Sequence, residues 1–288
     1  MREEGNDMWD MKPPKVLVGV DRPDCEAALQ YAVAEARRRG CGIHLVHVAR
    51  PILASRALDD IALVDGELRE TSRVLLARAA ARTQQLIDAQ DPDDERLSVS
   101  TEVTHGSVVA MLHSLSAHAA LLVMEHQGMG RHGETPTLSV TAGVAAVAQC
   151  PVVAVPDSWR PTAGIGGAVV VGISDPERDR AVVEEARNEA ERRRTDLVVV
   201  GPATDPMLAE ELLRHASAAE LLVVARHWRK HSIGAPLGRT ARELLRHGAV
   251  PVLVVDPAAR KRRPSADRGP SPSEKYALAT LPREDQGP

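Results

Sequence analysis

The sequence contains no phenylalanine, and aromatic residues make up only 2% of its 288 residues. Because hydrophobic residues still reach 43%, the buried cores must be built from Val, Leu, Ile and Ala. Single-stranded nucleic acid is bound largely by stacking of bases on aromatic side chains. A nucleic-acid partner of that kind is therefore not expected.

Cysteine is scarce as well, and long apolar runs are missing. Cys25, Cys41 and Cys150 are an odd number without CxxC spacing, which argues against a disulfide framework and against a zinc site. No apolar run approaches the roughly 20 residues of a membrane span, and residues 1–14 lack the apolar centre of an export signal. We expect a cytoplasmic protein with no membrane partner, whose cysteines pack as small apolar residues.

One long segment of the chain occurs twice. Residues 119–156 align with residues 219–256 at a constant offset of 100 and without a gap. Each copy has an apolar run, a loop, a helix of small residues and a second apolar run. A repeat this long implies two copies of one domain rather than a solenoid, whose period is about 20 to 50 residues. The matching positions include Leu121 and Leu221, Val123 and Val223, Pro136 and Pro236, Pro151 and Pro251, and Val155 and Val255.

Strands and helices alternate along the first copy. Strands are predicted at 15–20, 43–48, 97–103, in the run that follows Ala119, and at 152–155, with helices at 24–39, about 66–89, 106–118 and in the small-residue stretch. This alternation indicates a parallel sheet with right-handed crossovers. In such sheets a ligand lies beyond the carboxyl ends of the strands, where the strand order switches. We expect Asp21 and the loop 125–139 to lie there.

Two of these elements carry more specific predictions. The segment 97–103 alternates apolar and polar residues at its start, as in an edge strand with one wetter face. The segment 50–96 is acidic at both ends, and its predicted helix at about 66–89 spaces Leu68, Leu75, Ala79 and Leu86 so that they share one face.

The second copy is shorter than the first. It begins with 168–173, which matches the first strand at an offset of 153, and the offset has fallen to 100 by the next matching strand. The 53 missing residues correspond to the acidic helix and the third strand, so we predict about four strands. The expected organisation is a leader at 1–14, domain one at 15–156, a linker at 157–167, domain two at 168–257 and a tail at 258–288, which holds too few apolar residues to fold.

Several separated segments resemble the universal stress protein superfamily: KVLVGVD near the start, GSV before a helix, LLVM before a glycine-bearing loop, and CPVVAVP. Two copies in one chain are similar to its tandem-domain members. The resemblance implies two doubly wound α/β domains of the adenine nucleotide alpha hydrolase type, the first five-stranded. It also implies a role in stress response, with ATP binding in some members.

The resemblance extends to an ATP motif: Gly, two residues, Gly, nine residues, Gly, then Ser or Thr. In the first copy these positions are Glu125, Gly128, Leu138 and Ser139, and in the second they are Ala225, Trp228, Gly238 and Arg239. Through the resemblance, nucleotide contacts are assigned to Asp21, Val48, Met124, Gly128, Ser139 and Val140. In the second copy Ser174, followed by Asp175, replaces the aspartate of the first strand.

Glu125 is the departure that weighs most against a nucleotide. Glycine lets backbone N–H groups approach phosphates closely, whereas Glu125 adds bulk and a negative charge. An acid aimed at the phosphates would cost several kcal/mol, on the order of Coulomb's law at intermediate dielectric. An acid turned outward would cost less. ATP binding is therefore expected in domain one at most.

Three functions follow from these observations. The first is a nucleotide-responsive or protein-binding regulatory module in stress response. The second is a nucleotide-independent scaffold, in which domain two completes an intramolecular pseudo-dimer. The third is weak ATP hydrolysis. Enzymatic activity is not expected, because a Walker A motif and a Gly-x-Ser-x-Gly elbow are absent and no Ser, His and Asp set can be placed convergently.

Charge and histidine patterns leave further alternatives. Residues 226–263 hold ten Lys and Arg against two acids, in a chain whose net charge is −4. This stretch is a solvated basic face, a site for an anionic ligand with Trp228 stacking on a base, or a site for the acidic segment at 50–96. The pairs His126 with His132 and His227 with His231 lack a zinc-like spacing to a Cys or carboxylate, so metal binding is not expected.

The last strand of each copy is expected at the edge of its sheet. Bare apolar edges are aggregation hazards, so Val152–Val155 and Val252–Val255 are expected to be paired. The resemblance implies that this edge forms the dimer in relatives and pairs the two copies within tandem chains. A further homodimer stays an alternative.

Overall fold

The computed structural model describes residues 14–49, 58–89, 97–126, 140–161, 167–226 and 237–258, with side chains only from residue 66 in the helix that begins at residue 58. The strands are β1 (Val16–Gly19), β2 (Ile43–Ala49), β3 (Val99–His105), β4 (Leu121–His126), β5 (Val152–Pro156), β6 (Ala168–Gly172), β7 (Leu197–Val200), β8 (Ala219–Ala225) and β9 (Val252–Val255). The helices are α1 (Glu26–Arg39), α2 (Leu58–Asp88), α3 (Val108–Ser116), α4 (Val140–Val147), α5 (Arg180–Arg193), α6 (Asp205–His215) and α7 (Arg239–His247).

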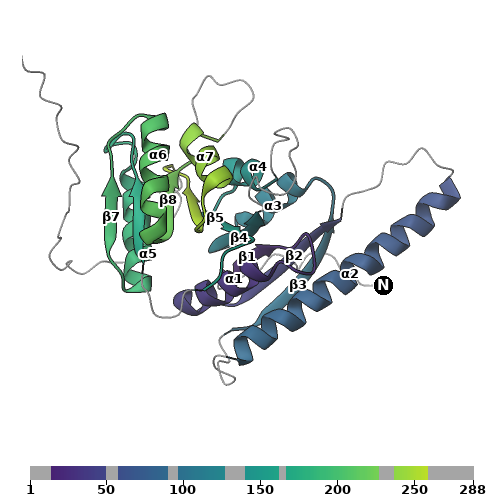
Figure 1. The fold of residues 1–288 in the computed structure, drawn as a ribbon. Coiled ribbons are helices and arrows are strands. Elements are labelled where there is room, and N and C mark those ends of the chain that lie inside the picture. Colours follow the sequence, from purple (N-terminus) through teal and green to yellow (C-terminus); the bar gives the residue numbers. More distant parts are fainter. Residues whose placement is uncertain are drawn as a thin grey trace, which may run out of the picture.

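All nine strands form one sheet in the order β3-β2-β1-β4-β5-β9-β8-β6-β7 (Figure 1). The first copy contributes five strands and the second contributes four, and every neighbouring pair is parallel except β5 with β9. In the second copy α6 follows β7 directly, so the described residues contain no counterpart of α2 and β3. The strand β3 lies at the edge of the sheet, as its alternating sequence predicts.

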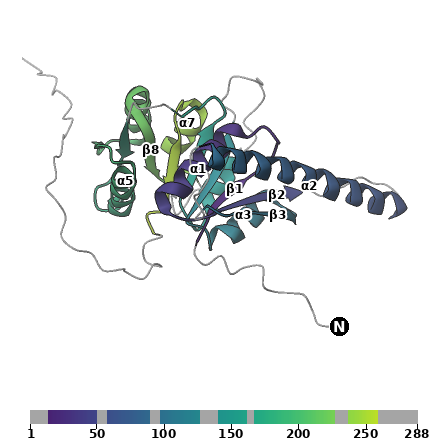
Figure 2. The same cartoon turned by 90° about the horizontal axis from the view of Figure 1, so that it is seen from below.

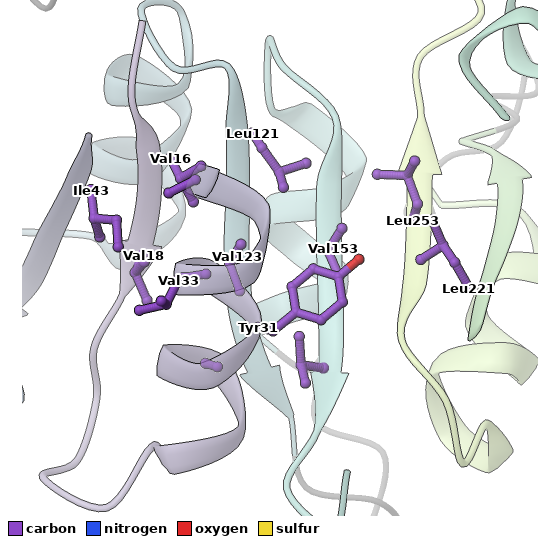
Figure 3. Packing of buried hydrophobic residues seen from close by; sticks show 14 of the residues in the cluster. Val16, Val18, Tyr31, Val33, Ile43, Leu121, Val123, Val153, Leu221 and Leu253 are labelled. Carbon is purple, nitrogen blue, oxygen red and sulfur yellow. The ribbon is translucent and has the colours of Figure 1, made fainter. Parts of the chain in front are cut away.

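Helices cover both faces of the sheet, and each face has its own core. One core lies beneath α1, α2 and α5 and includes Val18, Leu121 and Leu253, which Figure 3 shows with their neighbours. The other lies beneath α3, α4, α6 and α7 and includes Leu17 and Leu122. Adjacent residues of one strand therefore serve opposite cores. Both cores contain residues of both copies, so the hydrophobic interior continues across the repeat boundary.

The long helix α2 differs in its buried face from the predicted one. Leu76 and Ala79 are buried, but so are Ser72 and Thr83, whereas Leu68, Leu75 and Leu86 are only partly buried. The two hydroxyls donate to the carbonyl oxygens of the preceding turn, Ser72 to Leu68 at 2.7 Å and Thr83 to Ala79 at 2.8 Å. Since each hydroxyl is satisfied within the helix, it can be buried at little cost. In Figures 1 and 2 the first part of α2 runs beyond the strands.

The three cysteines are free and buried, as expected from their number and spacing. Among the described residues no helix combines the length and the apolar character needed to cross a membrane.

The two copies meet at the antiparallel pair β5 and β9. Val153 lies opposite Leu253, and the flanking partners are Val152 with Val254 and Ala154 with Val252. Val153 and Leu253 are equivalent positions at the offset of 100. The pseudo-twofold axis that relates the copies therefore passes between these two residues.

A ring of buried charges joins α1 to α5 beside this axis. Arg39 donates to Glu189 at 2.5 Å, and Arg193 donates to Glu35. Within its own helix each arginine also pairs with the glutamate four residues before it. The two helix ends align at an offset of 154, since Gly40 and Arg194 both cap in the left-handed conformation, and this alignment superposes Glu35 on Glu189 and Arg39 on Arg193. The ring thus shares the symmetry of the strands.

The ring is shielded from solvent. Three of its four side chains are at most 1% exposed, and Arg39 is 10% exposed. Burial by itself would raise the pKa of Glu189, but the charges of Arg39, Arg193 and Arg192 outweigh it and hold that pKa below the usual range of a glutamate. Glu189 is therefore ionised at neutral pH, and its charge is balanced inside the protein.

Candidate functional site

The strand order reverses between β1 and β4 in the first copy. From β1 the chain moves outward through β2 to β3 and then returns to β4 on the other side of β1. This is the point at which open α/β sheets bind ligands. Residues 20–25 follow β1 here, and β4 ends beside them at Glu125 and His126. This switch point is the candidate functional site.

The side chain of Glu125 is buried at the switch point. Its side chain is 3% exposed, so it neither points outward into solvent nor lies open in a loop. One carboxylate oxygen accepts a hydrogen bond from Arg22, and the other accepts from the backbone N–H of Ala28 at 3.1 Å. The carboxylate is therefore paired with a cation and with the first turn of α1.

The contact with Ala28 replaces a missing helix cap. Cys25 occupies the N-cap position of α1 and makes no capping hydrogen bond with its side chain. Ala28 is the third residue of the helix. The backbone N–H at this position normally donates to the side chain of the N-cap residue. Glu125 provides that acceptor from a strand about a hundred residues away, and it places a negative charge at the positive end of the helix dipole.

The electrostatics of the site follow from this arrangement. Burial alone would lower the pKa of Arg22, but the hydrogen bond and charge of Glu125 raise it overall. Burial, together with the negative charges of Glu125 and Asp21, raises the pKa of Cys25 to about 12. The thiol of Cys25 therefore stays protonated at neutral pH and is a poor nucleophile.

The second copy has a buried carboxylate at the same place, but from a different element. The offset of 154 that aligns α1 with α5 pairs Cys25 with Asp179, which is fully buried. Its carboxylate accepts from the backbone N–H of Ser174 at 2.8 Å and of Asp175 at 3.1 Å, in the loop that follows β6. Ala225 stands at the position of Glu125 and is buried. Each copy thus turns one carboxylate into the loop after its first strand.

The residues assigned to nucleotide contact divide between the loop and one face of the sheet. Asp21 is exposed, two residues after β1. Val48 and Met124 are buried in the core beneath α3 and α4, and Val140, the first residue of α4, packs against the same core. Glu125, the next residue after Met124, extends toward the opposite face, where α1 lies. Gly128, Leu138 and Ser139 lie outside the described residues.

Arg226, the first cation of the basic segment, is paired within the protein. It donates to Asp256 and, at 2.8 Å, to the carbonyl oxygen of Ala148 in the first copy. This arginine therefore ties the end of β8 to β9 and to the first copy. Arg239, the first residue of α7, is exposed. Residues 227–236, with Trp228, lie outside the described residues.

A second polar cluster lies at the other end of the strands of the first copy. His44 contacts Ser100 and Glu102, and Lys15 contacts Ser100. The sequence led us to expect no convergent Ser, His and Asp set, but the structure brings a serine, a histidine and a glutamate together. The signal was present in the sequence, because residues 100 and 102 share one face of a strand that lies beside His44.

Known proteins resemble this chain in sequence and in fold. The profile of the universal stress protein family matches residues 13–156. The chain is 26% identical to a universal stress protein of Mycobacterium tuberculosis, over 84% of this chain and 96% of the relative. It is 25% identical to one of Mycolicibacterium smegmatis, over 84% and 97%. The crystal structure of a universal stress protein from Archaeoglobus fulgidus gives a TM-score of 0.62 at 14% identity, covering 84% of this chain and 96% of the other.

Proposed function

Because the chain belongs to the universal stress protein family, we propose that it serves in stress response as a regulatory module that acts through protein contacts and does not require a nucleotide. The observation that carries this proposal is Glu125, whose carboxylate accepts hydrogen bonds from Arg22 and from the first turn of α1. A helix N-terminus and an arginine are the groups that attract a phosphate. At this switch point both already hold an anion that belongs to the protein.

The pairing of β5 with β9 supports the same proposal. Both copies complete one sheet within one chain, and the trimmed second copy retains all of the strands that this pairing needs. We propose that the second copy acts chiefly as the partner of the first in an intramolecular pseudo-dimer. Interaction surfaces for other proteins would then be presented by one rigid body.

A second candidate, ATP binding in the first copy alone, is favoured by one observation. Val48, Met124 and Val140 gather at the core beneath α4, whereas Glu125 extends toward α1. A nucleotide that approached from the α4 side would not meet the carboxylate directly. Weak ATP hydrolysis would also need that site.

Thermal unfolding with millimolar Mg-ATP separates the two candidates. A ligand present at a hundred times its dissociation constant stabilises the folded state by about 2.7 kcal/mol. We expect no rise in Tm with Mg-ATP beyond that with Mg²⁺ alone, and no absorbance of copurified nucleotide. A clear rise for the wild-type protein would overturn nucleotide independence.

The variant Glu125→Gly supplies the matched comparison. It frees Arg22 and the N–H of Ala28, and it restores the glycine of the family motif. We expect this variant to melt at a lower temperature without ligand, because α1 loses its cap and Arg22 its partner. If Glu125 is what excludes the phosphates, the variant also gains a rise in Tm with Mg-ATP that the wild type lacks.

A further inference from the structure

Lys15, His44, Ser100 and Glu102 form a continuous chain of hydrogen bonds that joins the residue before β1 to β2 and β3. Lys15 Nζ lies 3.0 Å from Ser100 Oγ, which lies 2.9 Å from His44 Nδ1, and His44 Nε2 lies 3.1 Å from Glu102 Oε2. Ser100 pairs directly with His44 in the ladder between β2 and β3. The backbone of the sheet therefore fixes the spacing of the serine and the imidazole.

The chemistry of the two end groups sets the direction of this chain. A lysine ammonium only donates hydrogen bonds, and an ionised carboxylate only accepts them. Glu102 therefore accepts a hydrogen bond from the N–H at Nε2 of His44, which leaves Nδ1 as the accepting nitrogen of the neutral ring. Lys15 donates to Ser100, so the serine hydroxyl can give its own proton to Nδ1.

The competing acceptor for that proton is weaker. Ser100 Oγ also lies 3.3 Å from the carbonyl oxygen of Ile43, which is farther than its 2.9 Å to His44. Hydrogen bonds weaken toward the long end of the range. The imidazole is therefore the preferred partner of the hydroxyl, in the geometry that a general base needs.

The cluster is also accessible. Lys15 and Ser100 are partly exposed, and the side chains of His44 and Glu102 are 12% and 10% exposed. β3 lies at the edge of the sheet, with α2 packed on its other face. A small reagent can therefore approach Ser100 at the edge of the sheet.

We propose that Ser100 is a nucleophilic serine that is acylated by activated acyl donors such as aryl esters. Ser100 Oγ attacks the carbonyl carbon while its proton passes to His44 Nδ1. The bond between the carbonyl carbon and the aryl oxygen then breaks, and the leaving aryl oxide takes the proton from the imidazolium. The products are acyl-Ser100 and a phenol, with no oxidant or reductant required.

The other two residues have separate roles. Lys15 donates a hydrogen bond to Ser100 Oγ at 3.0 Å, and its positive charge stabilises the alkoxide character of that oxygen as the hydroxyl proton passes to His44. Glu102 is a positioning residue that fixes the tautomer of His44 and stabilises the imidazolium. The alternative is that these hydrogen bonds only satisfy the polar side chains of an edge strand. In that case Ser100 would have no unusual reactivity.

The test uses p-nitrophenyl acetate on the full chain at neutral pH, with acetylation of each serine followed over time by peptide mass spectrometry. Treatment with hydroxylamine separates acetyl-serine esters from acetylated amines. Ser107 is the internal control, because it is an exposed serine before α3 whose side chain makes no capping hydrogen bond. Positioned general bases contribute about 100-fold or more, so we expect Ser100 to be acetylated about 100-fold faster than Ser107.

Variants identify the base. His44→Gln should lower the rate at Ser100 to that at Ser107, and Glu102→Gln should lower it by about tenfold or more, while acetylation of Ser107 is unchanged in both. A purely structural role for Glu102 would change Tm but not the ratio of the two rates. Equal rates at Ser100 and Ser107 in the wild type would overturn the proposal, and this comparison needs no variant to fold. An unchanged rate in folded His44→Gln would overturn it as well.

Discussion

Replacing Glu189 by glutamine removes one charge from the ring between α1 and α5. Glu189 accepts from Arg39 at 2.5 Å and from Arg192 at 2.6 Å, and it also pairs with Arg193. It is 1% exposed, so water cannot replace the lost carboxylate. Removing one partner of a buried ion pair costs about 3–5 kcal/mol, because the remaining charge is left uncompensated.

Thermal unfolding followed by circular dichroism measures this cost. For a domain of 150 to 250 residues, 1 kcal/mol changes Tm by about 2–4 °C, so Glu189→Gln should lower Tm on the order of 10 °C. The control is Glu177→Gln, which removes an exposed glutamate that lies 3.6 Å from Arg180. Exposed pairs contribute little, and we expect no measurable change in that variant.

A double-mutant cycle shows whether the ring joins the two copies. Arg39→Gln and Glu189→Gln each leave an unpaired charge, but together they remove one charge of each sign. We expect the double variant to lose about 1–3 kcal/mol less than the sum of the single losses. Additive losses, or a Glu189→Gln variant as stable as the Glu177→Gln control, would refute the view that this ring couples α1 to α5.

Three further outcomes follow from features described above. The pKa of Glu189 is held below its usual range, so its contribution to stability is complete above the unfolded pKa of about 4.3. That contribution is lost as the pH falls through the folded-state pKa. Tm should therefore fall more steeply in acid for the wild type than for Glu189→Gln. A Cβ at Gly172 would lie 2.5 Å from the buried Leu212 Cδ1, whereas one at Gly19 would lie 3.5 Å from Leu112 Cδ1. Gly172→Ala should therefore cost about 1–3 kcal/mol in urea unfolding and Gly19→Ala far less, and equal losses would contradict the difference in space. Arg194 caps α5 with a φ of 55°, so Arg194→Gly should stabilise the protein by about 0.5–1 kcal/mol, which a lower urea midpoint would contradict.

The architecture could be predicted from the sequence because buried parallel strands have a simple pattern. VLVG, LLVM and VVAV are unbroken apolar runs, since both sides of each strand face a core. The change of offset from 153 to 100 predicted the trimmed second copy for the same reason. The offset is obtained by comparing the apolar runs of the two copies, so it requires no knowledge of side-chain contacts.

The site could not be predicted because its contacts are distant in the sequence and depend on orientation. The sequence shows an acid at residue 125 but not that Arg22 and Ala28 lie within reach of it. The ring between α1 and α5 was missed for a similar reason. Arg39 suits the end of a helix dipole, and nothing local indicates that it also meets Glu189.

Two further features depend on polar side chains, which a pattern of apolar residues does not reveal. The leucines alone predict a different buried face of α2, because Ser72 and Thr83 donate to carbonyl oxygens of their own helix and are buried as well. The cluster of Lys15, His44, Ser100 and Glu102 was not expected because it depends on the pairing of β3 with β2, which places Ser100 beside His44. Alternation on two adjacent strands would have indicated it.

The pairing of β5 with β9 also has a consequence for mass action. Two separate chains that met through such a short edge would dissociate on dilution, and their pairing would follow the amount of protein in the cell. Here the segment between β5 and β6 keeps both edges in one molecule, at an effective concentration on the order of millimolar for a short connection. The assembly state of this interface therefore does not change with expression level. Any signal that opened it would have to act on the folded chain itself, by weakening strand or helix contacts rather than by changing abundance.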